Sequence, residues 1–151
     1  MIKKGRWHSL FGYAVLLIGM ASAAHASEAN PLKDFRWENR VVVAQLDEAS
    51  LTEFEAELER QMVKLKEYRL VVIAITNEEI KVYGSGEKQV SNEGLKVALV
   101  EQLTGMDVAL IGLDGGVKRR FTLSSFSWDN VYALIDSMPM RRVELRAQKR
   151  I

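Results

Sequence analysis

The residues of this chain that could do chemistry are carboxylates, lysines, arginines and hydroxyls. There is no cysteine, and the two histidines, His8 and His25, lie in an N-terminal stretch with the features of a cleavable leader. Thiol redox chemistry, Ser-His-Asp or Cys-His nucleophiles and zinc sites are therefore not expected in the mature protein. The six methionines are too scattered for a thioether copper site. We expect neither a metal site nor a cofactor.

Two pairs of adjacent acids, Asp47–Glu48 and Glu78–Glu79, are the candidates for acid–base catalysis or calcium binding. Neighbouring side chains point in different directions on most backbones, and acids near a helix start usually cap the helix or favour its dipole. Asp114-Gly115-Gly116 lacks the further glycine of a phosphate-binding loop and predicts a hairpin turn. No residue is predicted to be catalytic, which favours a protein that is not an enzyme.

Residues 1–26 have the pattern of a signal peptide. Lys3, Lys4 and Arg6 precede an apolar run from 10 to 24, and Ala24-His25-Ala26 matches the cleavage pattern before Ser27. The alternative is an uncleaved anchor, but the run is short for a bilayer span of roughly 20 residues. We expect a periplasmic or secreted protein, residues 27–151, with no stable membrane anchor after cleavage.

The charge of the chain argues against nucleic acid as a partner. The whole chain has a formal net charge of +1, and removing the three basic leader residues makes it slightly negative. A near-neutral domain gives no reason to expect binding to the phosphates of a nucleic acid. The expected partner is an unknown envelope protein or surface component. The basic tail from Arg141 to Arg150 either touches anionic lipid or lipopolysaccharide, or is a solvated terminus.

The elements that must position these residues can be read from hydrophobic periodicity. Runs at 41–46 and 70–75 predict strands buried on both faces. Between them, a capping box at 50–53 and apolar residues at spacings of three and four predict an amphipathic helix; these are Leu51, Phe54, Leu58, Met62 and Leu65. The polar stretch 77–89 predicts a loop.

The second half predicts a helix, a hairpin and a final helix. Ser91 can cap a helix that carries Leu95, Leu99 and Leu103 and ends at Gly105. Runs at 108–113 and 117–121 flank the predicted hairpin turn. Ser127 can cap a last helix, and Pro139 ends it.

This order, β-α-β-α-β-β-α, predicts a single α/β domain with a four-stranded mixed sheet flanked by three helices. The first two strands should pair in parallel and the hairpin should complete the sheet. The element order matches the minimal thioredoxin-like fold.

Three segments strengthen this interpretation: Pro31-Leu32 with 35–40, then 110–118, then 135–144. Together they resemble domain of unknown function family 4174, which implies a thioredoxin-like fold in exported bacterial proteins and vertebrate extracellular-matrix proteins. The resemblance covers nearly all of residues 27–151, although Leu113 stands where the family pattern has lysine. It supplies no catalytic residues.

The residues of a thioredoxin active site are missing. Thioredoxins carry a reactive cysteine where the first strand meets the first helix, and this junction reads Gln45-Leu46-Asp47-Glu48-Ala49-Ser50. The cis-proline before the third strand is replaced by Thr104-Gly105-Met106-Asp107. A thiol mechanism is therefore excluded for this chain.

The family-like ends should meet at the end of the sheet where the first strand begins. We expect Trp37 to pack on Met140, and Arg36, Arg40 or Arg141 to pair with Asp136 or Glu144. The candidate binding residues are Arg36, Trp37, Arg40, Met140, Arg141 and Arg142. The alternative is a structural clamp that fixes the two ends of the domain.

Two classes of function remain open. The first is a non-enzymatic envelope module that binds a protein or surface component, favoured by the missing cysteine and histidine. The second is a degenerate thioredoxin- or peroxiredoxin-like relative that acts through a partner's thiol or a bound cofactor. Only the expected fold favours the second class, and a fold does not determine a function.

Overall fold

The protein is described by a computed structural model over residues 32–84 and 93–149, with side chains described outside 93–95. The predicted leader and the Ser91 cap lie outside these residues. The elements, in chain order, are η1 Lys33–Phe35, β1 Arg40–Gln45, α1 Glu48–Glu67, β2 Leu70–Ile75, β3 Ile80–Tyr83, α2 Glu93–Leu103, β4 Val108–Ile111, β5 Val117–Phe121, η2 Leu123–Ser125, α3 Trp128–Ser137 and α4 Pro139–Gln148.

The strands form one mixed sheet in the order β3-β2-β1-β4-β5. β1 and β2, which flank α1, pair in parallel as predicted. The other three pairings are antiparallel, including the predicted β4–β5 hairpin. The described part therefore has a mixed α/β architecture with five strands and four α-helices, and the prediction of four strands and three helices was wrong on both counts.

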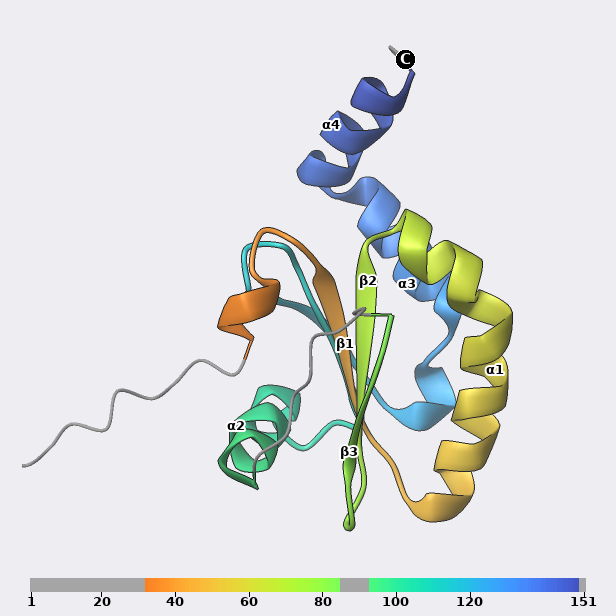
Figure 1. Ribbon diagram of the computed structural model, residues 1–151, viewed down its shortest axis with the longest axis vertical. Helices are drawn as coiled ribbons and strands as arrows, with labels where there is room; N and C mark the ends of the chain where they lie inside the picture. The colour runs from red at the N-terminus through yellow and green to blue at the C-terminus, as the bar shows by residue number, and fades with distance from the viewer. Residues whose placement is uncertain (1–31, 85–92, 150–151) are drawn as a thin grey trace, which may run out of the picture.

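The sheet is covered on both faces, as the buried runs of β1 and β2 require (Figure 1). On one face, Val42, Val72 and Leu110 pack with the apolar sides of α1 and α3. On the other, Val43 and Ile73 pack with η1 and α2. Because strand side chains alternate between faces, two separate clusters of buried residues result.

The additional strand, β3, lies in the stretch predicted as a loop. A turn after β2 brings it back: the Thr76 hydroxyl accepts hydrogen bonds from the backbone N–H groups of Glu78 and Glu79 at 3.2 and 3.1 Å. β3 is an edge strand of four half-buried residues. Its four residues, Ile80–Tyr83, lie within a mostly polar stretch and give an alternation too short for hydrophobic patterning to identify.

Helix α1 begins earlier than its sequence suggested. Asp47, rather than Ser50, is the N-cap, and its Oδ1 accepts a hydrogen bond from the Ser50 backbone N–H at 2.7 Å. The predicted capping box at 50–53 was therefore wrong. Leu51, Phe54, Leu58 and Leu65 are buried as expected, whereas Met62 is 48% exposed.

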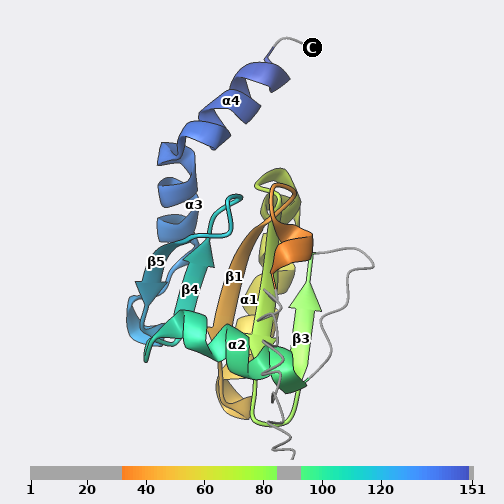
Figure 2. The same ribbon diagram turned by 90° about the vertical axis from the view of Figure 1, so that its left-hand side faces the viewer.

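At the other end of the domain, Ser127 caps α3 as predicted, accepting a hydrogen bond from the Asn130 N–H at 3.2 Å. α3 ends before Pro139, but Pro139 then begins a further helix, α4, at the first-turn position where a missing N–H costs nothing. Figure 2 shows α4 extending beyond the end of the sheet. Most of the tail predicted to be a basic segment is thus helical.

Candidate functional site

Arg40 is the first residue of β1 and is completely buried. Its guanidinium donates to both carboxylate oxygens of Glu144 on α4, at 3.0 and 3.3 Å, and to the Tyr68 carbonyl at 2.9 Å. Its Nε has no hydrogen-bond partner in the described part of the chain. The fork of two parallel hydrogen bonds ties the start of the sheet to the end of the domain.

Arg141 is the second buried arginine, at 1% exposure. It donates to the Glu67 carboxylate at 2.9 Å and pairs with Asp136 at 3.4 Å. Its guanidinium lies 4.2 Å from the centre of the Tyr68 ring. We call Arg40, Arg141, Glu67, Asp136 and Glu144 the arginine cluster. Its members come from β1, α1, α3 and α4, so it joins four elements.

The predicted meeting of the two family-like ends is confirmed. Of the three candidate arginines, Arg40 pairs with Glu144 and Arg141 with Asp136 and Glu144, whereas the Arg36 guanidinium lies over the Trp37 ring. Packing of Trp37 on Met140 was expected to bury the indole, and this is wrong, because the two side chains are 57% and 48% exposed. Trp37 has a positive φ of 66°, and its N–H donates to the Leu113 carbonyl at 2.7 Å. This backbone position turns the chain into β1 without burying the indole.

The six predicted binding residues therefore fall into two groups. Arg40 and Arg141 are buried and paired, which suits a clamp. Trp37, Met140 and the side chains of Arg36 and Arg142 are exposed, and the Arg36 guanidinium lies 5.5 Å from the centre of the Trp37 ring. Each of these two arginines pairs with at least one carboxylate of the cluster, so neither presents an uncompensated charge to a ligand within the described residues.

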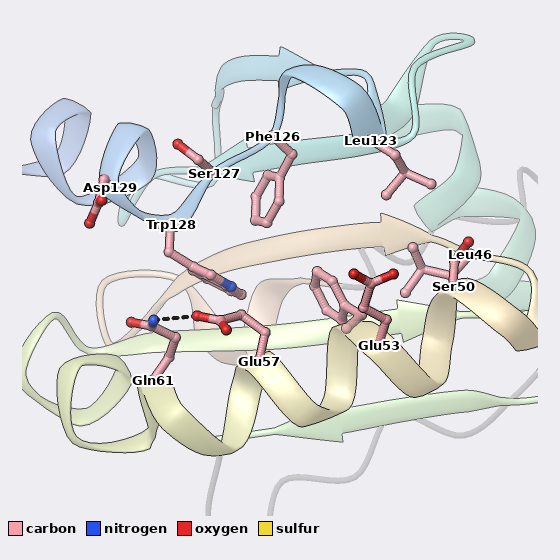
Figure 3. A pocket seen from close by; sticks show the side chains of 11 residues that line it. Leu46, Ser50, Glu53, Glu57, Gln61, Leu123, Phe126, Ser127, Trp128 and Asp129 are labelled. Atoms are coloured by element: carbon pink, nitrogen blue, oxygen red, sulfur yellow. Dashed lines mark hydrogen bonds between the residues drawn. The ribbon is translucent and has the colours of Figure 1, made fainter.

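A different site lies on the α1–α3 side of the sheet. A groove of about 470 Å³ runs between the first half of α1 and the segment leading into α3 (Figure 3). Its lining residues are Leu46, Ser50, Glu53, Phe54, Glu57, Gln61, Leu123, Phe126, Ser127, Trp128 and Asp129. We call this the α1–α3 groove.

The floor of the groove is aromatic. Phe54, Phe126 and Trp128 lie with ring centres 5.1 to 5.9 Å apart, and the Phe126–Trp128 pair is edge-to-face. Phe54 and Trp128 are at least nine-tenths buried, so the rings are held rigidly. Leu123 at the rim is 38% exposed. The exposed part of this floor is mainly the half-buried Phe126, which offers apolar area to a ligand at little entropic cost.

The rim of the groove is acidic. Glu53, Glu57 and Asp129 line it, and no lysine or arginine does among the described residues. Glu57 is oriented by the Gln61 amide, which donates at 2.7 Å and itself accepts from the Tyr132 hydroxyl at 3.0 Å. The Gln61 hydrogen bond, followed by the neighbouring Arg60, lowers the pKa of Glu57. Figure 3 shows Glu53 and Glu57 facing the segment of Phe126 and Trp128.

Sequence reasoning missed this groove, although two signals were present. Glu53 and Glu57 are four residues apart, which places both on one face of a helix beside the apolar side of α1. Phe126 and Trp128 flank the predicted cap Ser127. Neither signal reveals that the α3 segment faces α1, because that proximity arises only from the packing of both helices on one face of the sheet.

The other acidic residues that the sequence offered as candidates cap helices, hold turns or pair with nearby lysines. Asp47 caps α1, and Glu79 pairs with Lys81 at 3.0 Å on the edge strand. Asp114 accepts from the Gly116 N–H and pairs with Lys118. Asp107 accepts from the Leu123 N–H at 2.7 Å. Leu46 and Ser50, at the junction where a thioredoxin cysteine was sought, line the groove.

Neither a metal cluster nor a membrane span was found in the part of the chain that is described. No three or more histidine, aspartate or glutamate side chains within 32–84 and 93–149 are grouped so that they could hold a metal ion. None of the helices there is long and apolar enough to cross a bilayer.

Comparison with known proteins supports the resemblance noted in the sequence. The model of a family described as Domain of unknown function (DUF4174) matches residues 31–144, a range that begins just before η1 and ends at Glu144 of the arginine cluster. No curated protein matches the chain, and no solved structure does. The family match spans most of the chain, and the protein therefore belongs to the DUF4174 family.

Proposed function

We propose that this protein is an exported, non-enzymatic binding module of the bacterial envelope, and that the α1–α3 groove is its ligand site. The ligand is a cationic and partly apolar segment of an envelope protein. One observation carries this proposal: three carboxylates, of which only Glu57 has an ion-pair partner among the described residues (Arg60, outside the lining), line a groove with an aromatic floor. Export is supported by the leader-like residues 1–26, and the absence of cysteine argues against a thiol enzyme.

The groove has the features that recognise a basic side chain. A guanidinium or ammonium group gains from an aromatic face within about 6 Å and from carboxylates nearby. Glu53 and Asp129 form neither ion pairs nor hydrogen bonds through their carboxylates within the described residues, so a ligand cation would not have to displace a partner from them. Leu123 and Phe126 add the apolar area that a neighbouring ligand side chain would cover.

A photo-cross-linking experiment tests the site. A photoreactive amino acid replaces Leu123 at the groove, and in a matched control it replaces Val97, which is 62% exposed on α2. We expect the Leu123 protein to give a defined cross-linked partner in cells and the Val97 protein to give none of it. Equal cross-linking from both positions would contradict a ligand site at the groove.

The captured partner then allows a test of charge. The double change Glu53→Lys and Asp129→Lys should reduce affinity for the partner at least tenfold, because it places cations where a cation must bind. The control is Glu59→Lys with Glu101→Lys, which changes net charge equally at exposed positions outside the lining. If both double variants bind the partner equally, the proposal is wrong.

A thioredoxin-like relative that acts on a partner's thiol is the second candidate. The position of Leu46 and Ser50 in the groove favours it, since the β1–α1 junction is where a thioredoxin-like protein meets its substrate. An insulin-reduction or peroxide assay on the purified protein should give no rate above a blank without protein. A rate that disappears with Glu53→Lys and Asp129→Lys would instead support this candidate.

A further inference from the structure

After the α1–α3 groove, the surface of α4 that faces away from the domain is the second candidate binding surface. Two side-chain stripes run along this helix. Met140, Val143 and Ala147 form an apolar stripe at spacings of three and four, and Arg142 and Arg146 begin a basic stripe that Lys149 continues. Met140 and Val143 are 48% and 56% exposed. Among residues 32–84 and 93–149, no part of the domain covers either stripe.

The third side of α4 holds it in place. Arg141 and Glu144, one turn apart, are the α4 members of the arginine cluster, and Glu144 is also 3.6 Å from Arg69. The helix is therefore fixed at its start by buried ion pairs, while Figures 1 and 2 both show it extending past the end of the sheet. An extended, anchored helix presents its outer stripes to a flat surface.

The charges at this end of the molecule are unbalanced. The carboxylates of Glu67, Asp136 and Glu144 all pair with arginines of the cluster or with Arg69. By contrast, Arg142, Arg146 and Lys149 make no side-chain ion pair or hydrogen bond within the described residues. The helix dipole favours Arg146 and Lys149 at the end of α4, but it does not explain Arg142, which lies near the start of the helix, where a cation is disfavoured.

We propose that α4 docks on an anionic lipid bilayer through these two stripes. An interfacial helix places its apolar side chains at the boundary of the acyl chains while its basic side chains contact lipid phosphates. The loop of Trp37, which is 57% exposed, lies next to α4, because Arg69 donates to the Trp37 carbonyl and pairs with Glu144. Tryptophan favours the same interfacial layer.

Vesicle co-sedimentation tests this proposal with protein expressed from the whole chain. The probes are vesicles of phosphatidylcholine alone and vesicles containing roughly one third phosphatidylglycerol. We expect binding to the anionic vesicles that weakens as salt rises, and little binding to the neutral ones. Intact mass verifies that all compared proteins have the same N-terminus, since an uncleaved leader would itself bind lipid.

Matched variants locate the binding surface. Arg142→Gln, Arg146→Gln and Lys149→Gln together should reduce partitioning roughly hundredfold, about fivefold for each cation. The control, Arg60→Gln, Lys96→Gln and Arg119→Gln, removes the same charge elsewhere and should change partitioning less than twofold. Val143→Ser should weaken binding with all cations present.

Circular dichroism melts confirm that the variants are folded. Failure of the wild-type protein to bind anionic vesicles would overturn the proposal, as would equal losses in the two triple variants. Binding to an acidic protein but not to anionic vesicles would identify α4 as a protein-binding element and would also overturn it. The substitutions on α4 leave the lining of the α1–α3 groove unchanged, so the vesicle test of α4 is independent of the groove.

Discussion

Arg40 is a charged residue at the start of a buried strand. Two acceptors, the Glu144 carboxylate and the Tyr68 carbonyl, compensate for the burial of its guanidinium. Burial of an arginine is tolerated only when such partners replace water. The cost of removing one partner therefore exceeds the net worth of the pair, because the other charge stays buried.

We expect Arg40→Ala to lower the free energy of unfolding by about 3–5 kcal/mol. Arg142→Ala is the matched control, since its side chain is exposed, and should change stability by less than about 0.5 kcal/mol. Urea denaturation of both variants provides the measurement. Similar effects of the two substitutions would show that the arginine cluster does not clamp the domain.

Substitution of Trp37 should have only a small effect on stability. Because the indole is 57% exposed, Trp37→Ala should cost less than about 1 kcal/mol rather than the cost of an emptied core site. The positive φ of 66° strains any residue with a Cβ. Trp37→Gly should therefore be at least as stable as Trp37→Ala in thermal melts, and the reverse order would contradict the backbone assignment.

Tyr132 stacks on Trp128 of the groove floor and donates a hydrogen bond to Gln61 at the rim. Its ionisation should make the stability of the domain depend on pH. Burial raises the pKa of Tyr132 to about 12, above the value of about 10 in an unfolded chain. The folded state binds this proton more tightly, so its contribution to stability is complete below pH 10 and is lost between about pH 10 and 12.

Tyr132→Phe should cost about 1 kcal/mol at neutral pH through the lost hydrogen bond to Gln61. It should also flatten the decline in stability above pH 10. Urea midpoints of the two proteins at pH 8, 10 and 11 measure the difference. A constant gap between them across this range would mean that Tyr132 does not titrate with folding.

At the scale of elements, truncating α4 tests whether this helix is a structural part of the domain or a tail that frays. A chain ending at Met138 loses Glu144 and leaves Arg40 buried with only the Tyr68 carbonyl. We expect a loss of about 3–5 kcal/mol, as for breaking any buried pair. A chain ending at Leu145 keeps the cluster and serves as the control, and equal urea midpoints for the two truncated chains would argue for a dispensable tail.

At the scale of the whole molecule, the opposite characters of its two surfaces are the main feature. The α1–α3 groove is acidic and aromatic, whereas the exposed side of α4 is basic and apolar. The two lie on different elements, so one molecule could contact a lipid surface and a protein ligand at the same time. Both proposals require export to an envelope compartment.

At the scale of the whole molecule, we predict the N-terminus of the exported protein. The mature N-terminus should be Ser27, because the apolar run and Ala24-His25-Ala26 fit signal peptidase. These residues lie outside those that the structure describes. Intact-mass measurement of the exported protein tests the cleavage directly, and retention of Trp7 would indicate an anchored protein instead.

The sequence by itself predicted most of the elements, because each depends on local chemistry. The apolar runs of β1 and β2, the Asp-Gly turn of the hairpin and the Ser127 cap are short-range signals, and all three were confirmed. The sequence also predicted that arginines such as Arg40 and Arg141 pair with acids near the C-terminal end, since buried arginines require carboxylates. The family resemblance rested on ordered local motifs and was confirmed as well.

Only the tertiary structure decided what depends on partners distant in sequence. β3 is a strand because β2 offers it an edge, and α4 is held because Arg141 and Glu144 reach α1 and β1. Trp37 is exposed because Phe35, two residues before it, is the aromatic ring that this segment buries in the core. The groove exists because α1 and the α3 segment share one face of the sheet. Periodicity describes the side of an element that is buried, but it does not specify which other element covers that side.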